Sequence, residues 1–246
     1  MTLLSVVVPA YNEERFIGTL LEQIQRVPLS RLGVDLEIIV VDDCSSDRTA
    51  EIAAAQGVVV ERHARNGGKG RAVRTGIARA KGDYVMIQDA DLEYDPNDYV
   101  PMLEAMLARR GDVVYGSRYR AGPGIARGPA GKHERQSWAA FLGGRSLSLV
   151  ALAFTGAYLS DTVTALKLFR RDLLLELDLQ TSGFELDHEI TSKVLARGLT
   201  IVEVPVAYHP RSRAEGKKIG IRDWFAAVRT FWRFGAPRRR ARRPRS

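Results

Sequence analysis

Four acidic side chains follow a short apolar run in the segment "MIQDADLEYDP". Asp89, Asp91, Glu93 and Asp95 alternate with other residues, and at pH 7 they would repel one another unless a positive charge lay among them. Two carboxylates two residues apart at a strand end can both reach one hard divalent cation, with phosphate oxygens completing its ligand shell. Mg²⁺ and Mn²⁺ favour such oxygen ligands. Asp89 and Asp91 are therefore predicted metal ligands, and a solvated acidic turn is the alternative.

A glycine-rich segment, "NGGKGRAVRTG", carries the opposite charge. Gly67, Gly68 and Gly70 allow a close approach to the backbone, and the N-terminus of the helix that we expect next favours an anion. Lys69 and Arg71 add positive charge. The segment lacks the G-x-x-x-x-G-K-[ST] spacing of a P-loop. We interpret it as an anion-binding turn, and a tight turn with solvated cations is the alternative.

Alternating strands and helices must position these segments. Apolar β-branched runs predict buried strands, and apolar residues at helical spacing predict the helices between them. The expected strands span 3–8, 35–43, 57–63, 82–90, 111–118 and 199–209, with a strand-to-helix segment at 161–174. The expected helices span 14–27, 45–56, 70–80, 96–110, 135–159, 185–198 and 221–234. This alternation predicts an α/β fold with a mostly parallel sheet flanked by helices.

Polar loops follow the first four expected strands, at residues 9–14, 42–47, 66–70 and 89–93. Ligands of parallel sheets bind at the carboxyl ends of the strands, and these ends lie at one edge of the sheet. We therefore expect the four loops to converge there and to form the site.

The composition is that of an ordinary globular protein: 246 residues, 45% of them hydrophobic and 27% charged. The single cysteine, Cys44, excludes an internal disulfide framework, and the N-terminus lacks the basic region and cleavage site of a secretory signal. We expect a cytoplasmic protein. The four histidines have no metal-ligand spacing, and we expect structural or surface roles for His63, His133, His188 and His209.

The formal net charge of +8 is concentrated in residues 236–246, which hold six arginines and no acid and leave +2 for the rest of the chain. We expect this Pro/Arg tail to be disordered, and either to keep the protein soluble or to contact an anionic surface. Lipid headgroups are a better candidate than nucleic acid, because no base-reading module accompanies the tail. The uncharged run 146–160 is shorter than the about twenty residues of a spanning helix, so we predict at most an interfacial helix.

Several segments, in this order and spacing, resemble family 2 glycosyltransferases of the GT-A fold. They are "VVVPAYNEE", "IIVVDDCSSDRT", "NGGKGRAVRTG", "GDYVMIQDADLEYDP" and "GSRY". Three later segments resemble the branch that contains polyprenyl-phosphate (dolichyl-phosphate) mannose and glucose synthases: "SDTVTALKLFRRD", "GFELDHEIT" and "EVPVAYHPRSRAEGKKIG". The resemblance covers residues 3–234. It implies a GT-A domain over residues 1–235 with a Rossmann-like sheet, a nucleotide-sugar-binding half (1–120) and a helical acceptor half (121–235).

The resemblance also implies roles for single residues. Asp89 and Asp91 would bind Mg²⁺ or Mn²⁺ with the diphosphate, and Glu93 stands where relatives often have a third metal ligand. Tyr11 would lie against the base, and Asp43 would accept hydrogen bonds from it. The other donor-binding positions are Pro9, Glu13, Val41, Lys69 and Ala90, with a basic loop of Arg211, Lys217 and Lys218 that closes over the diphosphate.

The acceptor decides which catalytic groups are needed. Arg118 is expected near the sugar or the acceptor phosphate. A lipid phosphate is already ionised at neutral pH, whereas a hydroxyl acceptor needs a carboxylate to take its proton. Asp187 and Glu189 are the candidates for such a base, with surface charge or a structural ion pair as the alternative. The segment "TVTALKLF" departs from the usual T-x-[ST]-G-F-[KR] pattern but keeps Lys167.

The resemblance therefore implies inverting transfer of a hexose from GDP-mannose or UDP-glucose to a polyprenyl phosphate. Such an enzyme would work at the cytoplasmic face of a membrane, through an anionic lipid surface or a separate membrane partner. Transfer to a hydroxyl of a glycan or natural product is one alternative. A catalytically idle GT-A module is the other, and the intact Asp89, Asp91 and Asp43 argue against it.

Overall fold

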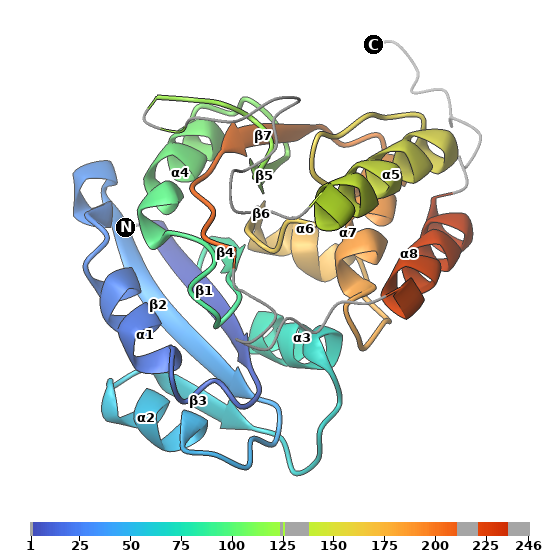
Figure 1. The fold of residues 1–246 in the computed structure, drawn as a ribbon. Helices are drawn as coiled ribbons and strands as arrows, with labels where there is room; N and C mark the ends of the chain where they lie inside the picture. The colour runs from blue at the N-terminus through green and yellow to red at the C-terminus, as the bar shows by residue number, and fades with distance from the viewer. Residues whose placement is uncertain (1, 124, 126–137, 211–220, 236–246) are drawn as a thin grey trace.

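The computed structural model describes residues 2–123, 125, 138–210 and 221–235. It shows an α/β fold in which helices cover a mixed β-sheet (Figure 1). The strands are β1 (Thr2–Ala10), β2 (Val34–Asp42), β3 (Val59–Arg62), β4 (Tyr84–Ile87), β5 (Val113–Ser117), β6 (Lys167–Arg170) and β7 (Ile201–Pro205). The helices are α1 (Ile17–Gln25), α2 (Thr49–Ala55), α3 (Lys69–Arg79), α4 (Tyr99–Leu107), α5 (Trp138–Thr155), α6 (Arg171–Glu176), α7 (Leu186–Ala196) and α8 (Ile221–Phe234), with short 3₁₀ helices η1 (Leu29–Leu32) and η2 (Pro96–Asp98).

The seven strands form one sheet in the order β3-β2-β1-β4-β6-β5-β7. All neighbouring pairs are parallel except those of β6, which runs antiparallel to both β4 and β5. The predicted, mostly parallel sheet is therefore confirmed. The strand expected within 161–174 begins only at Lys167, and its insertion between β4 and β5 was not indicated by the sequence.

The period of two along β1 divides the core into two layers. Leu4, Val6 and Val8 face the layer formed with α1, α2 and α4, whereas Val7 faces the layer formed with α3, α6 and α7. All four side chains are fully buried. Burial on both faces explains why this strand is a continuous apolar run and not an alternating one.

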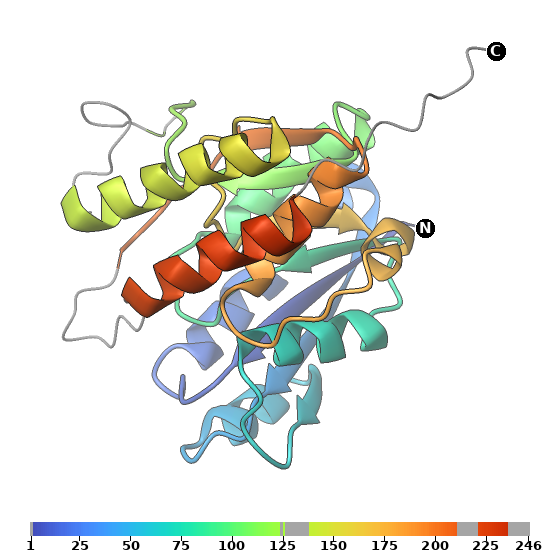
Figure 2. The same cartoon turned by 90° about the vertical axis from the view of Figure 1, so that its right-hand side faces the viewer.

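Helices α5 and α8 form an additional layer outside α7. They pack against each other and against α7, and both views of the ribbon show them side by side (Figure 1, Figure 2). Helix α5 ends at Thr155 because Gly156 adopts a left-handed conformation (φ 74°), which lets the chain leave the helix. The helix expected over 135–159 is thus shorter at its C-terminal end, while residues 135–137 and the 236–246 tail lie outside the described residues.

Helix α3 approaches the sheet closely at Gly76. A Cβ atom on this residue would overlap Val7 Cγ1 and would lie 3.3 Å from Val41 Cγ2. Both valines belong to central strands, so neither side chain can move away easily. The missing side chain at Gly76 thus sets the distance between helix and sheet.

We expect Gly76→Ala to lower the free energy of unfolding by about 1–3 kcal/mol, because the added methyl group overpacks the interface. Gly143→Ala in α5 is the matched control, since its new Cβ would meet no atom of the described residues within 4 Å. That change should stabilise the helix by up to about 1 kcal/mol. Urea unfolding of both variants measures the difference. Equal effects of the two substitutions would contradict this account of the α3 packing.

Candidate active site

The loops after β1 and β2 are held together by hydrogen bonds. The N–H of Asn12 donates to Ser45 Oγ (2.9 Å), and the N–H of Glu13 donates to Thr49 Oγ1 (2.8 Å). Tyr11 stays exposed beside these bonds. The two loops therefore meet at the carboxyl edge of the sheet as expected, while the roles of Tyr11 and Glu13 toward a nucleoside stay predictions.

Asp43 is buried after β2 and fixes the glycine-rich loop. Its carboxylate accepts the N–H groups of Gly67 (3.0 Å) and Gly68 (2.7 Å) and contacts His63 Nδ1 (2.6 Å). His63 Nε2 in turn contacts Thr75 Oγ1 (2.9 Å). Asp43 thus joins the loops after β2 and β3. The hydrogen bond to a base that the resemblance implies for Asp43 stays a prediction.

The close approach that the glycine-rich loop permits is to the chain's own backbone. A Cβ on Gly68 would lie 2.5 Å from the carbonyl oxygen of Ser182, and one on Gly70 would lie 2.7 Å from that of Thr181. The N–H of Arg71 also donates to Ser182 O (3.2 Å). These glycines therefore let α3 begin directly against the segment that precedes α7, and anion binding at this turn stays a prediction.

Lys69, the first residue of α3, contacts Asp89 of the acidic pair. Its ammonium lies 2.8 Å and 3.1 Å from the two carboxylate oxygens of Asp89. Asp91 accepts the backbone N–H of Glu93 (3.2 Å), and Leu92 between them has a positive φ of 58°. Asp89 and Asp91 are both partly exposed after β4. Their oxygen donors fit a hard divalent cation, and Asp89 already binds a positive charge.

Glu93 lies beside the end of the chain's last strand. Its carboxylate accepts the hydroxyl of Tyr208 (2.9 Å), and its carbonyl accepts the N–H of His209 (2.8 Å). Within the residues that the structure describes, no three His, Cys, Asp or Glu side chains group closely enough to hold a metal ion. A cation at Asp89 and Asp91 would therefore need further oxygen ligands from a substrate or water. Glu93 as a metal ligand stays a prediction.

Four side chains of alternating charge contact one another in a row from Asp89 into the interior. We call this row of Asp89, Lys69, Asp187 and Lys167 the charge chain. Asp187 on α7 contacts Lys167 Nζ (2.5 Å) with one oxygen and Lys69 Nζ (3.3 Å) with the other. Lys167 on β6 is fully buried, donates to the carbonyl of Thr164, and lies 5.0 Å from the ring centre of Tyr115.

The charges of this chain shift one another's titration. Burial alone would raise the pKa of Asp187, but Lys167 and Lys69 hold it at about 2. Burial alone would lower the pKa of Lys69, but Asp187 and Asp89 raise it above its ordinary value. Burial lowers the pKa of Lys167, against the attraction of Asp187. Asp187 is therefore a carboxylate at neutral pH, but it is a very weak proton acceptor.

Glu189 is buried two positions after Asp187 and holds the loop before α7. Its carboxylate accepts the N–H groups of Gln180 (2.9 Å) and Thr181 (2.8 Å) and the hydroxyl of Thr181 (2.6 Å), and it pairs with Lys193 (2.6 Å). Four donors to two oxygens explain its burial without an energetic penalty for an unpaired charge. This geometry supports the structural alternative given for Glu189.

Arg118, which follows β5, forms a bidentate salt bridge with Asp161. Its Nε and one Nη lie 2.7 Å and 2.8 Å from the two carboxylate oxygens of the fully buried Asp161. The guanidinium also lies 5.1 Å from the ring centre of Tyr208 and 5.6 Å from that of Tyr119. Arg118 is thus fixed by its own chain near Glu93, because Tyr208 contacts both side chains.

The remaining predicted positions divide into two groups. Pro9, Val41 and Ala90 are buried at the carboxyl edge, and Pro9 lies opposite Val41 in the register of β1 and β2. Arg211, Lys217 and Lys218 lie outside the described residues. Sequence reasoning missed Asp161 as the partner of Arg118, although a single acid after a long uncharged run was a usable signal.

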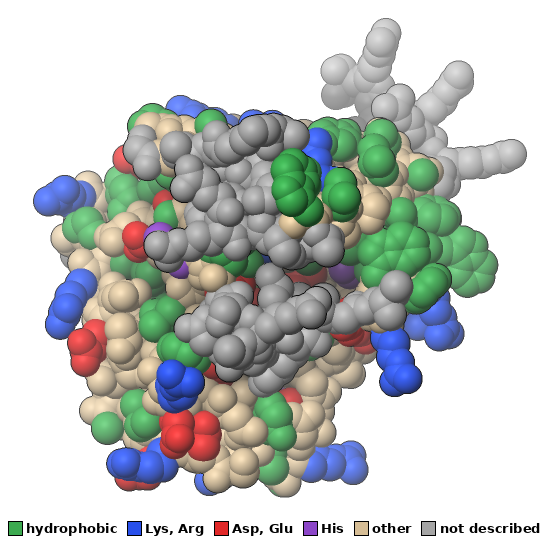
Figure 3. Space-filling view, in the orientation of Figure 1, with side chains coloured by type: hydrophobic (Ala, Val, Ile, Leu, Met, Phe, Trp, Pro, Cys, Tyr) green, Lys and Arg blue, Asp and Glu red, His purple; other side chains and the backbone are tan. Residues whose placement is uncertain are grey.

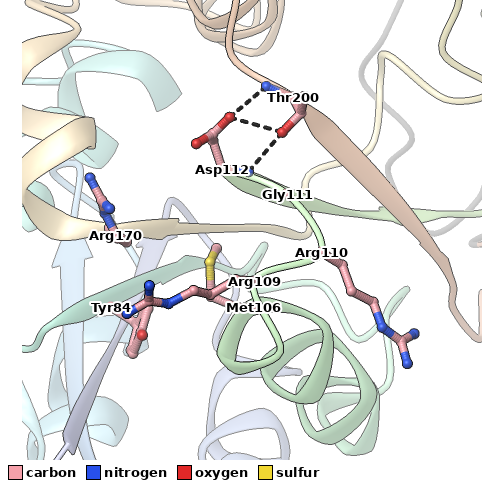
Figure 4. Close-up of a pocket in the computed structure, with 8 residues that line it drawn as sticks. All are labelled: Tyr84, Met106, Arg109, Arg110, Gly111, Asp112, Arg170 and Thr200. Atoms are coloured by element: carbon pink, nitrogen blue, oxygen red, sulfur yellow. Dashed lines mark hydrogen bonds between the residues drawn. The ribbon is translucent and has the colours of Figure 1, made fainter. Parts of the chain in front are cut away.

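A polar depression of about 340 Å³ lies at the opposite end of the sheet (Figure 4). Tyr84 begins β4, whereas Asp112 and Thr200 directly precede β5 and β7, so the depression is at the amino ends of these strands. Asp112 accepts the N–H and hydroxyl of Thr200 (2.8 Å each), and Arg109 and Arg170 lie around it. It does not include the acidic pair, and it is not the site described above.

Comparison with known proteins gives a consistent family. Residues 5–177 match Glycosyl transferase family 2. The low-salt glycan biosynthesis hexosyltransferase Agl6 of Haloferax volcanii is 33% identical over 209 residues, which cover 85% of this chain and 48% of that protein. A dolichyl-phosphate hexose transferase of the same organism is 32% identical over 210 residues, covering 85% of this chain and 84% of that one. The chain thus spans about half the length of the first relative and most of the second.

Solved structures share the fold. Glucosyl-3-phosphoglycerate synthase of Mycobacterium tuberculosis, in complex with UDP, has a TM-score of 0.68 and 25% identity; the match covers 96% of this chain and 81% of that chain. The same protein has also been solved with Mn²⁺, UDP-glucose and phosphoglyceric acid (TM-score 0.69, 23% identity, 94% and 80% covered). The fold predicted from the sequence is therefore confirmed.

His188, next to Asp187, is buried under α8. Its ring centre lies 5.1 Å from that of Phe231, and among the described residues its Nδ1 has no hydrogen-bond partner. Burial lowers the pKa of His188 to about 4, while Asp187 opposes this shift and Lys167 and Lys69 add to it. The ring is therefore neutral in the folded protein at pH 5–7.

This histidine should make stability depend on pH. In the unfolded chain its pKa is about 6.5, so below that value the unfolded state binds a proton that the folded state does not. Stability is therefore complete above pH 6.5 and falls as the pH drops toward 4. Between pH 6.5 and 5.0 we expect a loss of about 2 kcal/mol.

His188→Phe removes the titrating group and keeps a ring against Phe231. Urea unfolding of both proteins between pH 5.0 and 7.5 measures the difference, with other titrating groups common to both. The variant should lose about 2 kcal/mol less than the natural chain over this interval. Parallel pH profiles would show that His188 is not buried in its neutral form.

Proposed function

The chain belongs to glycosyl transferase family 2, and we propose that it moves a hexose from a nucleotide sugar to a polyprenyl phosphate with inversion at the anomeric carbon. GDP-mannose and UDP-glucose are the proposed donors, and Mg²⁺ or Mn²⁺ the proposed cofactor. A relative named dolichyl-phosphate hexose transferase, which this chain matches over most of its length, supports the choice of acceptor.

The proposal rests on the fact that both candidate bases, Asp187 and Glu189, are already held by hydrogen bonds and ion pairs within the protein. Asp187 is held between two lysines with a pKa of about 2, and Glu189 accepts four hydrogen-bond donors. Neither carboxylate is suited to take a proton from a hydroxyl nucleophile, because a general base needs a pKa near the working pH. A phosphate nucleophile is already ionised and needs no such group.

Leaving-group stabilisation then supplies most of the catalysis. Charge develops on the departing nucleoside diphosphate, and Lys69 places a permanent positive charge beside Asp89 where that group would lie. Asp89 and Asp91 would hold the metal ion, which stabilises the same charge. The M. tuberculosis relative solved with UDP supports a nucleoside diphosphate as the bound product. Arg211, Lys217 and Lys218 are proposed to contribute from the basic loop.

An exposed apolar surface supports work at a membrane. Trp138, Leu142 and Leu149 of α5, with Phe225 and Trp232 of α8, are between 58% and 67% exposed. Hydrophobic side chains gather visibly over α8 (Figure 3). Within the described residues no helix is long and apolar enough to cross a membrane.

Exposed arginines beside this apolar surface favour a membrane with anionic lipids. Arg222, Arg229 and Arg233 are exposed on α8, where Phe225 and Trp232 are exposed as well. Aromatic and basic side chains on one helix face are typical of helices that lie in the interface of an anionic bilayer. We propose that α5 and α8 bring the enzyme to the leaflet that contains its lipid acceptor.

The activity is tested with the full chain, Mn²⁺ and each donor, against a detergent-solubilised polyprenyl phosphate and a soluble glycan. We expect hexose transfer to the polyprenyl phosphate and none to the glycan. Asp91→Ala should lower the rate by about 10²–10³-fold, because it removes one ligand of the main electrostatic stabiliser.

Asp95→Ala is the matched control in the same acidic segment. Asp95 accepts the N–H of Asn97 at the start of η2, so its loss should cost stability of about 1 kcal/mol and leave most activity. If the enzyme transferred hexose to the glycan alone, the acceptor would be a hydroxyl group and not a lipid phosphate. Absence of both transfer and donor hydrolysis would identify an idle binding module.

Membrane attachment is tested by sedimentation with vesicles. The protein should sediment with anionic vesicles at low salt and be released by added salt. Phe225→Ser combined with Trp232→Ser should weaken this binding at least about tenfold, because two exposed aromatic side chains no longer enter the interface. Val59→Ser on the edge strand β3 is the control for loss of an exposed apolar side chain and should bind normally. Unchanged binding of the double variant would exclude α8 as the contact.

A further inference from the structure

Lys69 binds Asp89 where a metal ion would bind it. The ammonium lies 2.8 Å and 3.1 Å from the two carboxylate oxygens of Asp89, so a cation already contacts both atoms. The Lys69 side chain is only 12% exposed and its outer contact is the face of Phe184, 5.9 Å from the ring centre. A divalent cation that ligates Asp89 would be repelled by an ammonium that contacts both carboxylate oxygens, and we therefore expect the two cations to compete.

A second carboxylate keeps Lys69 from being lost when that competition occurs. Asp187 Oδ2 lies 3.3 Å from the same ammonium. Lys167 occupies the other oxygen of Asp187 at 2.5 Å and cannot leave, because it is fully buried. Asp187 thus offers Lys69 one carboxylate oxygen that Lys167 does not contact, at a fixed position.

We propose that a divalent metal ion and the Lys69 ammonium exchange at Asp89, with Asp187 as the carboxylate that receives Lys69. The proposal deepens the proposed function, since it assumes the divalent cation named there. Asp187 and Lys167 are positioning residues that act through Lys69. Before the metal binds, Lys69 neutralises Asp89; afterwards it is held by Asp187 and presents its charge to the diphosphate that accompanies the metal.

The exchange gives two substitutions opposite effects on metal affinity. Lys69→Met removes the competitor, so Mn²⁺ should bind about tenfold more tightly, which is the effect of losing one charged hydrogen bond. Asp187→Asn removes the receiver, so Lys69 should stay on Asp89 and Mn²⁺ should bind several-fold more weakly. If Lys69 and Asp187 only maintained the shape of the site, both substitutions would weaken the binding.

Binding is measured from the electron paramagnetic resonance signal of free Mn²⁺, with the full chain and the metal alone, after thermal melting has shown that each variant is folded. Arg71→Met is the matched control, because it removes an equal charge two residues along α3. A general electrostatic effect would tighten Mn²⁺ binding equally in both variants, whereas the exchange predicts a change within about twofold for Arg71→Met.

The outcomes separate this inference from the proposed function. Tighter binding by Lys69→Met than by both the natural chain and Arg71→Met supports the exchange, even if Asp187→Asn does not fold. Equal or weaker binding by Lys69→Met overturns it. A parallel titration of the natural chain with GDP or UDP present tests the function itself, and no Mn²⁺ binding under those conditions overturns the metal-dependent mechanism.

Discussion

A carboxylate held between two lysine side chains in the interior is the constraint on which the site depends. Asp187 comes from α7, Lys167 from β6 and Lys69 from the start of α3, so one acid connects three elements. Removing one member of a buried ion pair typically costs about 3–5 kcal/mol, because the other charge is left without a partner. None of these elements can therefore shift alone, so the start of α3, from which Lys69 extends to Asp89, is held in place.

The acids near the carboxyl edge divide into those that hold the chain and those that face solvent. Asp43, Asp161 and Glu189 are buried. Asp43 and Asp161 bind donors 25 and 43 positions away in the sequence, whereas Glu189 binds the loop that precedes its own helix. They replace the regular hydrogen bonds that loops lack. Asp89 and Asp91 are partly exposed, and this difference in burial, more than the type of residue, separates structural acids from candidate ligands.

The sequence predicted the parts of this arrangement that depend on neighbouring residues. Strand and helix periodicity, the edge where the loops meet and the acidic pair at Asp89 and Asp91 all follow from local patterns. The partners of Lys69 did not, because Asp187 lies 118 positions further along the chain. The neighbours of Gly68 and Gly70 were not predicted either, for the same reason: a local pattern shows that something can approach the backbone, but not that the backbone of residues 181–183 does so.

The place of β6 in the sheet also determines the order in which the protein can be completed on the ribosome. Lys167 pairs with Ile87, 80 positions earlier, and with Tyr115 on the other side, so β4 and β5 have no partner between them until β6 has been made. Between the end of β5 and the start of β6 lie 49 residues (118–166), which correspond to roughly 2–10 s of synthesis at about 5–20 residues per second. During that interval two apolar strand edges are open to pairing with other chains. The late synthesis of this central antiparallel strand thus leaves the sheet incomplete until β6 emerges.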